Sequence, residues 1–457
     1  MSSWPARSGG VMLEASRSPQ DGALVVVDEG AAVAEAEAWV VDAVPVDAVV
    51  ADADGPDVGV RPPVGVVPGE PPVQAAGAVT ASTSAPVASR LRAGRRREVT
   101  PGTYPATSAA AKPRPGHAPG ATPALWQDRV MALPVVLDVD TGVDDACALL
   151  LAAMHRALDL RAVTCVGGNA DVDAVVANTL TVLDAAERPD VVVARGADRP
   201  LLEAPVHASH VHGADGMGDL DWARSQRKPD PRHAVEVLRD VLLDAAADGS
   251  EDRLVTLVPL APLTNIALLL RTYPEAAAGL RELVFMGGAA QVGNATASAE
   301  FNVFHDPEAA AIVLDAACDL GVAVSMYGLD VFYEPRVARE TGRKLASAGG
   351  HGACELAGLL VEFQCDRFGS DSATIGDAGA VCAVIEPGAV RRQRLPVRVE
   401  LAGTWSRGRT IVDRRDWDGA LAHDPHGQAR TQVDVCLEVD GQRYATLWVD
   451  TVSGGMR

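Results

Sequence analysis

Hydrophobic and polar positions alternate in blocks from about residue 134 onward, and these blocks predict strands and helices in turn. Residues 135–139 are mostly β-branched and apolar, with an acid only at position 138, which predicts a buried parallel strand. Gly142 permits a tight turn, and apolar residues then recur at helical spacing from Ala146 to Met154. This strand and helix form the unit around which the remaining chain is organised.

The same alternation predicts further elements along the chain. Strands are expected at residues 160–166, 191–193, 254–258, 282–286 and 322–325, with short β-rich pieces near 395–413. Helices are expected after 169, near 232–246, from 262, from 306, over 350–368 and around Tyr444 to Val452. Residues 203–222 are predicted to be a functional loop, and the stretch from 287 to about 305 a long polar loop. Repeated strand–helix units indicate an α/β protein with a doubly wound, mostly parallel sheet flanked by helices.

Residues 1–130 follow no such pattern. They are dominated by Ala, Val, Pro, Gly and Asp, contain no Phe and show no sustained period. This composition predicts a disordered extension in front of one α/β domain over residues 131–457. We interpret its basic cluster, Arg90 to Arg97, as part of a solvated tail rather than as a patch for an anionic partner. Met131 directly precedes the first strand, so we hypothesise that the natural protein starts there.

The net charge, the hydropathy and the cysteine pattern limit which binding partners and which cellular compartment are expected. The net charge of −21 repels phosphate backbones, which argues against a nucleic-acid partner. No uninterrupted apolar run reaches membrane-spanning length, so no membrane partner is expected. The seven cysteines form no C-x-x-C pair, and most lie in apolar runs, as reduced core thiols do. These features predict a soluble cytoplasmic protein.

Four carboxylates gather where the first predicted strand ends: Asp138, Asp140, Asp144 and Asp145. Open α/β sheets bind their ligands at this edge. A helix amino terminus tolerates one or two acids through its dipole, but four repel each other unless a cation lies among them. Hard oxygen donors without a nearby histidine favour Ca²⁺ or Mg²⁺ over zinc. A metal site is therefore a better interpretation than a capped helix start with solvated acids.

Other predicted strand ends also finish in polar groups, at Asn169, at 260–265 and over Asn294 to Asn302, and Asp377 lies in a turn of small residues. Carboxamides and carboxylates, rather than Lys or Arg, indicate a neutral and hydroxyl-rich ligand, because such groups bond sugar diols well. A metal beside that ligand could bind its diol and a water together.

A second enzyme class has a similar strand-end motif. Asp138-Val-Asp140-Thr resembles the motif of aspartyl-phosphate phosphatases, in which the first Asp is a nucleophile. Those enzymes need a downstream lysine to hold the phosphate. The lysines here are Lys112, Lys228 and Lys344, and none lies at a predicted strand end. The phosphatase interpretation is therefore disfavoured.

The stretch Asp138-Val-Asp-Thr-Gly-Val-Asp-Asp145 resembles the amino-terminal signature of the inosine–uridine-preferring nucleoside hydrolases. Further family landmarks follow in order: Gly168-Asn169, His212-Gly-Ala-Asp-Gly216, Pro262-Leu-Thr-Asn265, Met286-Gly-Gly288, Gly293-Asn294, Ala299-Glu-Phe-Asn302, Asp306-Pro-Glu308, Gly328-Leu-Asp330 and Asp377. The resemblance covers about residues 134–452. Each piece alone is weak, but the ordered series is specific.

The resemblance implies Ca²⁺-dependent hydrolysis of the N-glycosidic bond of ribonucleosides, which gives ribose and the free base. By similarity the Ca²⁺ ligands are Asp140, Asp145, Asp377 and the backbone carbonyl of Leu260. The ion would hold the ribose 2′ and 3′ hydroxyls and the attacking water, and Asp140 or Asp144 would accept a proton from that water. The ribose-binding positions, which would also stabilise an oxocarbenium-like transition state, are Asp144, Asn169, Asn294, Glu300 and Asn302. The family also implies a small-molecule ribonucleoside partner and a homo-oligomer, either a dimer or a tetramer.

One position departs from the family pattern. Many members carry a histidine directly before the last metal-binding Asp, where it helps the base to depart, and here that residue is Gly376. His212 is the best substitute, although it could instead bond its own loop backbone. Gly376→His is expected to restore the missing donor if the family geometry is kept. Aromatic residues that could instead stack on a base, although each could equally belong to the core, are Phe332, Tyr333, Phe363 and Phe368.

The departure at Gly376 leaves a non-enzymatic alternative open. In that alternative the chain is a calcium-dependent nucleoside-binding protein that lost turnover with its histidine. His305 and His351 are predicted to have no catalytic role.

Overall fold

The computed structural model describes residues 132–454 apart from 221, 349–351, 417–423 and 428–430. The predictions for residues 1–130, for a start at Met131 and for His351 lie outside the described residues. None of the helices described in these ranges is both long enough and apolar enough to cross a membrane.

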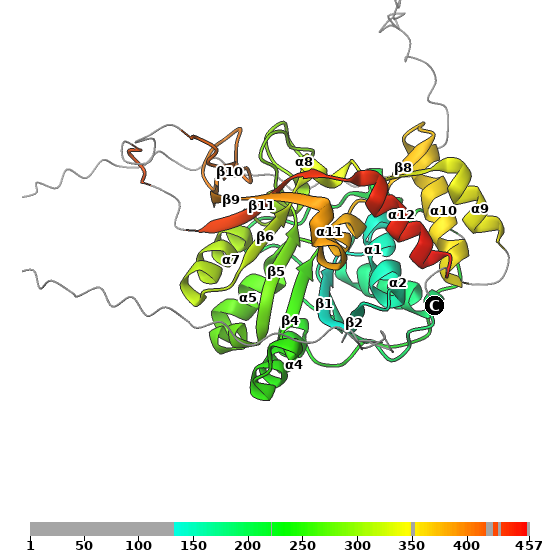
Figure 1. Ribbon diagram of the computed structural model, residues 1–457, viewed down its shortest axis with the longest axis horizontal. Helices are drawn as coiled ribbons and strands as arrows, with labels where there is room; N and C mark the ends of the chain where they lie inside the picture. The colour runs from blue at the N-terminus through cyan, green and yellow to red at the C-terminus, as the bar shows by residue number, and fades with distance from the viewer. Residues whose placement is uncertain (1–131, 221, 349–351, 417–423, 428–430, 455–457) are drawn as a thin grey trace, which may run out of the picture. The chain divides into compact units, whose positions relative to one another are not determined.

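A nine-stranded sheet forms the centre of the fold (Figure 1), in the order β10-β9-β11-β6-β5-β4-β1-β2-β3. Its strands are β1 (Leu133–Val139), β2 (Leu158–Cys165), β3 (Val192–Arg195), β4 (Val255–Pro259), β5 (Leu280–Met286), β6 (Val324–Tyr327), β9 (Val390–Val399), β10 (Thr410–Val412) and β11 (Gln432–Val439). In this spatial order, each strand from β11 through β6, β5, β4, β1 and β2 to β3 pairs in parallel with the next. At the other edge, β9 pairs antiparallel with both β11 and β10. A separate antiparallel pair consists of β7 (Arg336–Ala338) and β8 (Ser372–Thr374).

Helices cover both faces of the sheet. They are α1 (Val143–Met154), α2 (Val172–Ala185), α3 (Ser209–His212), α4 (Ala234–Asp248), α5 (Thr264–Thr272), α6 (Phe301–His305), α7 (Pro307–Leu320), α8 (Leu329–Phe332), α9 (Arg339–Ser347), α10 (Gly352–Arg367), α11 (Ala378–Ile385) and α12 (Gly441–Val452). Figure 1 shows α4, α5 and α7 as one group, and α1, α2, α11 and α12 as another.

The alternation of side chains along β1 explains the two hydrophobic cores. Val135, Leu137 and Val139 belong to the core shared with α1, α2 and α10 to α12, whereas Val136 belongs to the core shared with α4, α5 and α7. A strand buried on both faces needs apolar residues at nearly every position, which is the pattern seen in the sequence. The predicted doubly wound, mostly parallel α/β architecture is confirmed.

Most predicted elements are present within a few residues, including the closing helix and the helix that begins after Asp306. The Asp306 side chain accepts a hydrogen bond from the Ala309 N–H at 3.0 Å, as expected of an N-cap. The prediction missed β11, whose polar residues alternate with buried ones because one of its faces is only half covered. It also missed two short helices, α3 and α6, inside segments predicted to be loops. Both helices are too short to show a helical period.

Candidate functional site

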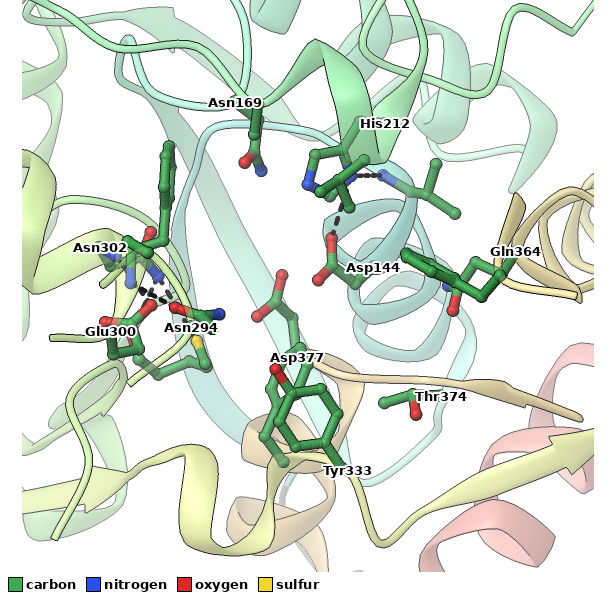
Figure 2. A pocket seen from close by; sticks show the side chains of 18 of the residues that line it. Asp144, Asn169, His212, Asn294, Glu300, Asn302, Tyr333, Gln364, Thr374 and Asp377 are labelled. Atoms are coloured by element: carbon green, nitrogen blue, oxygen red, sulfur yellow. Dashed lines mark hydrogen bonds and ion pairs between the residues drawn. The ribbon is translucent and has the colours of Figure 1, made fainter. Parts of the chain in front are cut away.

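A cavity of about 600 Å³ opens where β1, β2, β4 and β5 end, at the edge expected for a ligand in an open α/β sheet (Figure 2). The predicted site residues that line it are Asp144, Asn169, His212, Leu260, Asn294, Glu300, Asn302 and Asp377. The other two, Asp140 and Asp145, are completely buried and do not line the cavity. Residues that lie far apart in the sequence are therefore brought together at one site.

Three carboxylates approach each other most closely at this edge. Asp144, Asp145 and Asp377 each offer an oxygen atom, and these atoms all lie within 4.8 Å of one another. The turn before α1 holds Asp145, because its Oδ2 accepts the N–H of Gly142 at 2.9 Å and its Oδ1 that of Asp140 at 3.3 Å. The backbone thus positions the acids before any ligand binds.

Asp140 lies beside this cluster with one oxygen satisfied and one orphaned. Its Oδ2 accepts the N–H of Asn169 at 2.8 Å, whereas its Oδ1 is buried without a hydrogen-bond partner among the described residues. The chain between β2 and Asn169 crosses so near to this carboxylate that a Cβ at Gly168 would lie 2.1 Å from Oδ2. Only glycine fits there. An orphaned, buried carboxylate oxygen needs a cation or a proton.

The negative charges of the carboxylate cluster also require a positive counter-charge. Burial, together with the charge of Asp144, raises the pKa of Asp145 to about 7. Burial and the neighbouring carboxylates raise the pKa values of Asp140 and Asp377 well above the usual range. Of the described residues that line the cavity, Arg336 is the one Lys or Arg, and its Nε donates to Ser372 Oγ at 2.9 Å. No lysine or arginine among the described lining residues therefore neutralises the acids, so a bound metal ion is the expected counter-charge.

The donors present fit a hard divalent cation. Every donor atom in the cluster is a carboxylate oxygen, as Ca²⁺ and Mg²⁺ prefer. The carbonyl oxygen of Leu260 accepts a hydrogen bond from Asn302 Nδ2 at 2.9 Å. A carbonyl oxygen has a second lone pair, which is free to bind a metal. The cluster thus brings together two of the predicted metal ligands, Asp145 and Asp377, with Asp144 as a third donor, whereas Asp140 and the Leu260 carbonyl stay predictions.

Glu300, Asn294 and Asn302 form a group on one side of the cavity (Figure 2). Glu300 caps α6, since its Oε1 accepts the N–H of Asn302 at 2.8 Å and its Oε2 accepts the N–H groups of Gly288 and Val303. Burial raises the pKa of Glu300 to about 7, although these three donors favour the carboxylate. Asn302 Nδ2 also donates to the Met286 carbonyl at 3.2 Å. Because these polar groups are held by the backbone, they can orient a sugar without moving.

His212 is buried at the end of α3, across the cavity from Tyr333 (Figure 2). Its Nδ1 accepts the N–H of Val143, the first residue of α1, at 3.2 Å, and lies 3.7 Å from Asp144 Oδ1. Burial lowers the pKa of His212, with the charge of Asp144 opposing this change. An Nδ1 that accepts a backbone N–H leaves the proton on Nε2, so His212 is a neutral hydrogen-bond donor. It bonds α1 rather than its own loop.

The cavity wall opposite Glu300 and Asn302 contains residues that the sequence pattern does not single out. Gln364 and Thr374 line the cavity on the side away from Glu300 and Asn302 (Figure 2). Gln364 lies on α10 four residues before Phe368, which directly follows the helix and donates its N–H to the Gln364 carbonyl at 3.0 Å. This spacing is the signal in the sequence that both residues share a face. Other lining residues that the sequence did not single out include Phe301, Phe304 and Arg336. His207, His210 and Val211 also line the cavity and lie in the segment 203–222 predicted to be a functional loop.

The aromatic residues proposed from the sequence separate into two sets. Phe332, Tyr333 and Phe368 line the cavity, whereas Phe363 is absent from its wall and packs near Gly218. Position 376 has no free space for a side chain, so the condition attached to Gly376→His, that the family geometry is kept, is not met. A Cβ there would lie 2.6 Å from Cζ of Phe332, and Gly376 has a φ of +46°, which side chains rarely adopt.

The fold and the site together define an N-glycosyl hydrolase of the nucleoside hydrolase type, and three comparisons support this. The family model described as inosine-uridine preferring nucleoside hydrolase matches residues 135–446. The chain is 35% identical to an inosine-uridine preferring nucleoside hydrolase of Leishmania major over 68% of this chain and 95% of that protein. It is 38% identical to the non-specific ribonucleoside hydrolase RihC of Klebsiella pneumoniae over 67% of this chain and 95% of that protein.

A solved structure agrees with the two sequence relatives. The structure of an inosine-guanosine nucleoside hydrolase has a TM-score of 0.63 and 30% identity, and the match covers 70% of this chain and 98% of that one. The chain therefore belongs to the inosine-uridine preferring nucleoside hydrolase family.

Proposed function

We propose that the protein hydrolyses the N-glycosidic bond of ribonucleosides in a Ca²⁺-dependent reaction that releases ribose and the free base. The observation that carries this proposal is the carboxylate cluster in the middle of a cavity that is lined by carboxamides (Figure 2). The acids provide a site for a hard cation, and the carboxamides match the hydroxyl groups of a sugar. Family membership supplies the reaction class.

Asp140, Asp145, Asp377 and the carbonyl of Leu260 would hold the calcium ion. When bound, the ion supplies positive charge that binds sugar hydroxyls and makes water more acidic. Asp140 or Asp144 then accepts the proton of the attacking water. Asp144 borders the cavity directly, whereas Asp140 lies beneath it.

The remaining groups hold the two parts of the substrate. Asn169, Asn294 and Asn302 orient the ribose, and the charge of Glu300 stabilises positive charge that develops on the sugar as the bond breaks. His212 donates its Nε2–H to the departing base, because its Nδ1 is occupied by the Val143 N–H. The base thus leaves toward His212, Gln364 and Thr374.

The experiment that tests this function is an assay for free ribose with a panel of ribonucleosides. We expect ribose release that stops with a chelator and returns when Ca²⁺ is added. Calorimetric binding of nucleosides without any ribose release would instead support the calcium-dependent binding protein. If the panel is neither bound nor cleaved, the proposal is wrong.

We also propose a cytoplasmic location and a homo-oligomeric state. The buried thiols of Cys147, Cys165, Cys365, Cys382 and Cys436 form no disulfide within the described part of the chain, which suits a reducing compartment. The oligomeric state, a dimer or tetramer, rests on the family resemblance, and light scattering coupled to size exclusion would measure it.

A further inference from the structure

Arg336 on β7 is the one lysine or arginine among the described residues that line the cavity. It lies opposite Thr374 in the antiparallel pairing of β7 with β8. Thr374 in turn lies on the side of the cavity away from Glu300 and Asn302 (Figure 2). Arg336 therefore adds a positive charge to the wall at the end of the cavity proposed to hold the base.

Two serines hold the guanidinium of Arg336 in place. Its Nε donates to Ser372 Oγ at 2.9 Å, and its Nη2 donates to Ser370 Oγ and to the Ser372 carbonyl, each at 3.3 Å. Both serines also line the cavity. Among the described residues Nη1 has no acceptor, so the N–H groups of that nitrogen are free to bind a ligand.

No acid within the described part of the chain neutralises the charge of Arg336, because its hydrogen bonds all go to neutral oxygens and it forms no ion pair there. Arg339, the first residue of α9, differs on both points, since it pairs with Asp366 and does not line the cavity. A guanidinium stays charged at all ordinary pH values, and its planar fork matches the two oxygens of a carboxylate. An unpaired fork at a cavity wall is therefore suited to an anionic group on the ligand.

Charged side chains divide the cavity into a negative and a positive part. Glu300 lies at the end proposed to hold the ribose, and Asp144 and Asp377 lie between the two ends (Figure 2). A negative group on the ribose would face the Glu300 carboxylate, which repels it. The same group on the outer edge of the base would approach Arg336, which attracts it. This distribution of charge favours a nucleoside with a neutral ribose and a negatively charged base.

We propose that Arg336, held by Ser370 and Ser372, binds an anionic group on the base, and that the protein hydrolyses ribonucleosides whose base carries such a group, for example a carboxylate. This inference rests on the proposed function. The reaction stays the same: water adds its hydroxyl group to the ribose C1′, the bond from C1′ to the base nitrogen breaks, and the base keeps the bonding electrons and gains a proton. The guanidinium contributes binding and orientation of the base through charge-assisted hydrogen bonds.

Steady-state kinetics with a matched pair of substrates test this site. The pair is 5-carboxyuridine and 5-carbamoyluridine, which have nearly the same shape and differ in the charge of the group on C5. We expect the ratio of kcat/KM for the acid to that for the amide to fall about tenfold in Arg336→Gln, because a charge-assisted hydrogen bond is lost. Comparing this ratio between variants cancels the intrinsic difference in leaving ability of the two bases. An unchanged ratio would show that Arg336 only braces β7 against β8 and would overturn the proposal.

Two further variants separate the guanidinium fork from charge in general. Arg336→Lys keeps a positive charge without the planar fork, so it should lower the ratio by only about threefold. Arg343→Gln removes an exposed charge on α9 that does not line the cavity, and it is the control that should leave the ratio unchanged. An equal fall in Arg343→Gln and Arg336→Gln would mean that net charge alone sets the ratio, and would overturn the site. Melting curves identify any variant that fails to fold, and if Arg336→Gln fails, Arg336→Lys decides.

The outcome for this inference is separable from that for the proposed function. If the wild-type protein releases no ribose from any nucleoside, the proposed function fails, and calorimetric titration of the same acid and amide then tests the site by binding alone. Tighter binding of the acid that Arg336→Gln abolishes would support the site, and unchanged relative affinities would overturn it. Inorganic phosphate that binds through Arg336 without competing with the acid would mean that the site takes a free anion, and would also overturn the proposal.

Discussion

The two ends of the cavity are built in different ways. At the end proposed to hold the sugar, the carboxylate of Glu300 accepts three backbone N–H groups, and Asn302 donates to two backbone carbonyls. At the end proposed to hold the base, Gln364 and Thr374 are half-buried and Phe368 is 59% exposed. Side chains held by the backbone are pre-organised for one ligand geometry, whereas exposed ones can adapt. The comparison suggests an enzyme that is strict about ribose and more tolerant of the base.

Removing a metal-binding acid should break the sugar end completely. Asp377→Ala or Asp145→Ala should lower kcat/KM by on the order of a thousandfold or more and should abolish Ca²⁺ binding, because the cation loses a charged ligand. Activity assays and metal analysis of the purified variants measure both effects. Asp252→Ala, at an exposed acid far along the chain from the cluster, is the control and should change neither. A fully active variant that lacks metal would contradict the assignment.

At the base end, the loss of His212 should have a smaller and substrate-dependent effect. His212→Ala should lower kcat/KM for inosine and uridine by about ten- to a hundredfold, since a neutral imidazole contributes a hydrogen bond at the low end of acid assistance. An activated substrate, p-nitrophenyl riboside, needs no such help and should change by less than about threefold.

His210→Ala is the matched control for this substitution, because it lies on the same short helix with an exposed side chain. We expect it to have the smaller effect on the natural nucleosides. If His212→Ala slows the activated and the natural substrates equally, His212 acts on folding or on the sugar and not on the departing base.

The contrast between the two ends also explains what the sequence could predict. The proposed sugar end is built at strand ends, where apolar runs stop at acids and carboxamides, so Asp140 and Asn169 stand out in the sequence as polar groups at predicted strand ends. The roles expected of them and of Glu300 follow from the resemblance to the family. The base end is built from α3, α8, α10 and β8, which are short or carry their site residues on one face only. Long-range packing, such as that of Phe332 on Gly376, leaves no periodic trace in a sequence. For that reason the sequence does not single out Gln364 and Thr374, and it gives no sign that Phe332 fills the space beside Gly376.

The smallest effect concerns the stability of the metal-free protein and its dependence on pH. Burial and neighbouring charge raise the pKa of Asp145 to about 7 in the folded state, above the value of an unfolded Asp. Between these two values the folded state binds protons that the unfolded state does not, so stability falls as pH rises through that window. The melting temperature of the calcium-free protein should therefore decrease between pH 5 and pH 8. Asp145→Asn, which cannot ionise, should make this decrease shallower.

Calcium should reverse the trend, because it competes with protons for the same oxygens and binds more tightly as pH rises. At a Ca²⁺ concentration of about a hundred times Kd, mass action adds about 2.7 kcal/mol, which corresponds to a rise of roughly 3–4 °C in a chain of this size. The rise should be larger at pH 8 than at pH 5 and absent in Asp377→Ala. Thermal melts with chelator, Ca²⁺ and Mg²⁺ at both pH values measure it. A melting temperature that responds to pH but not to either cation would mean that protons, rather than a metal, neutralise the sugar end.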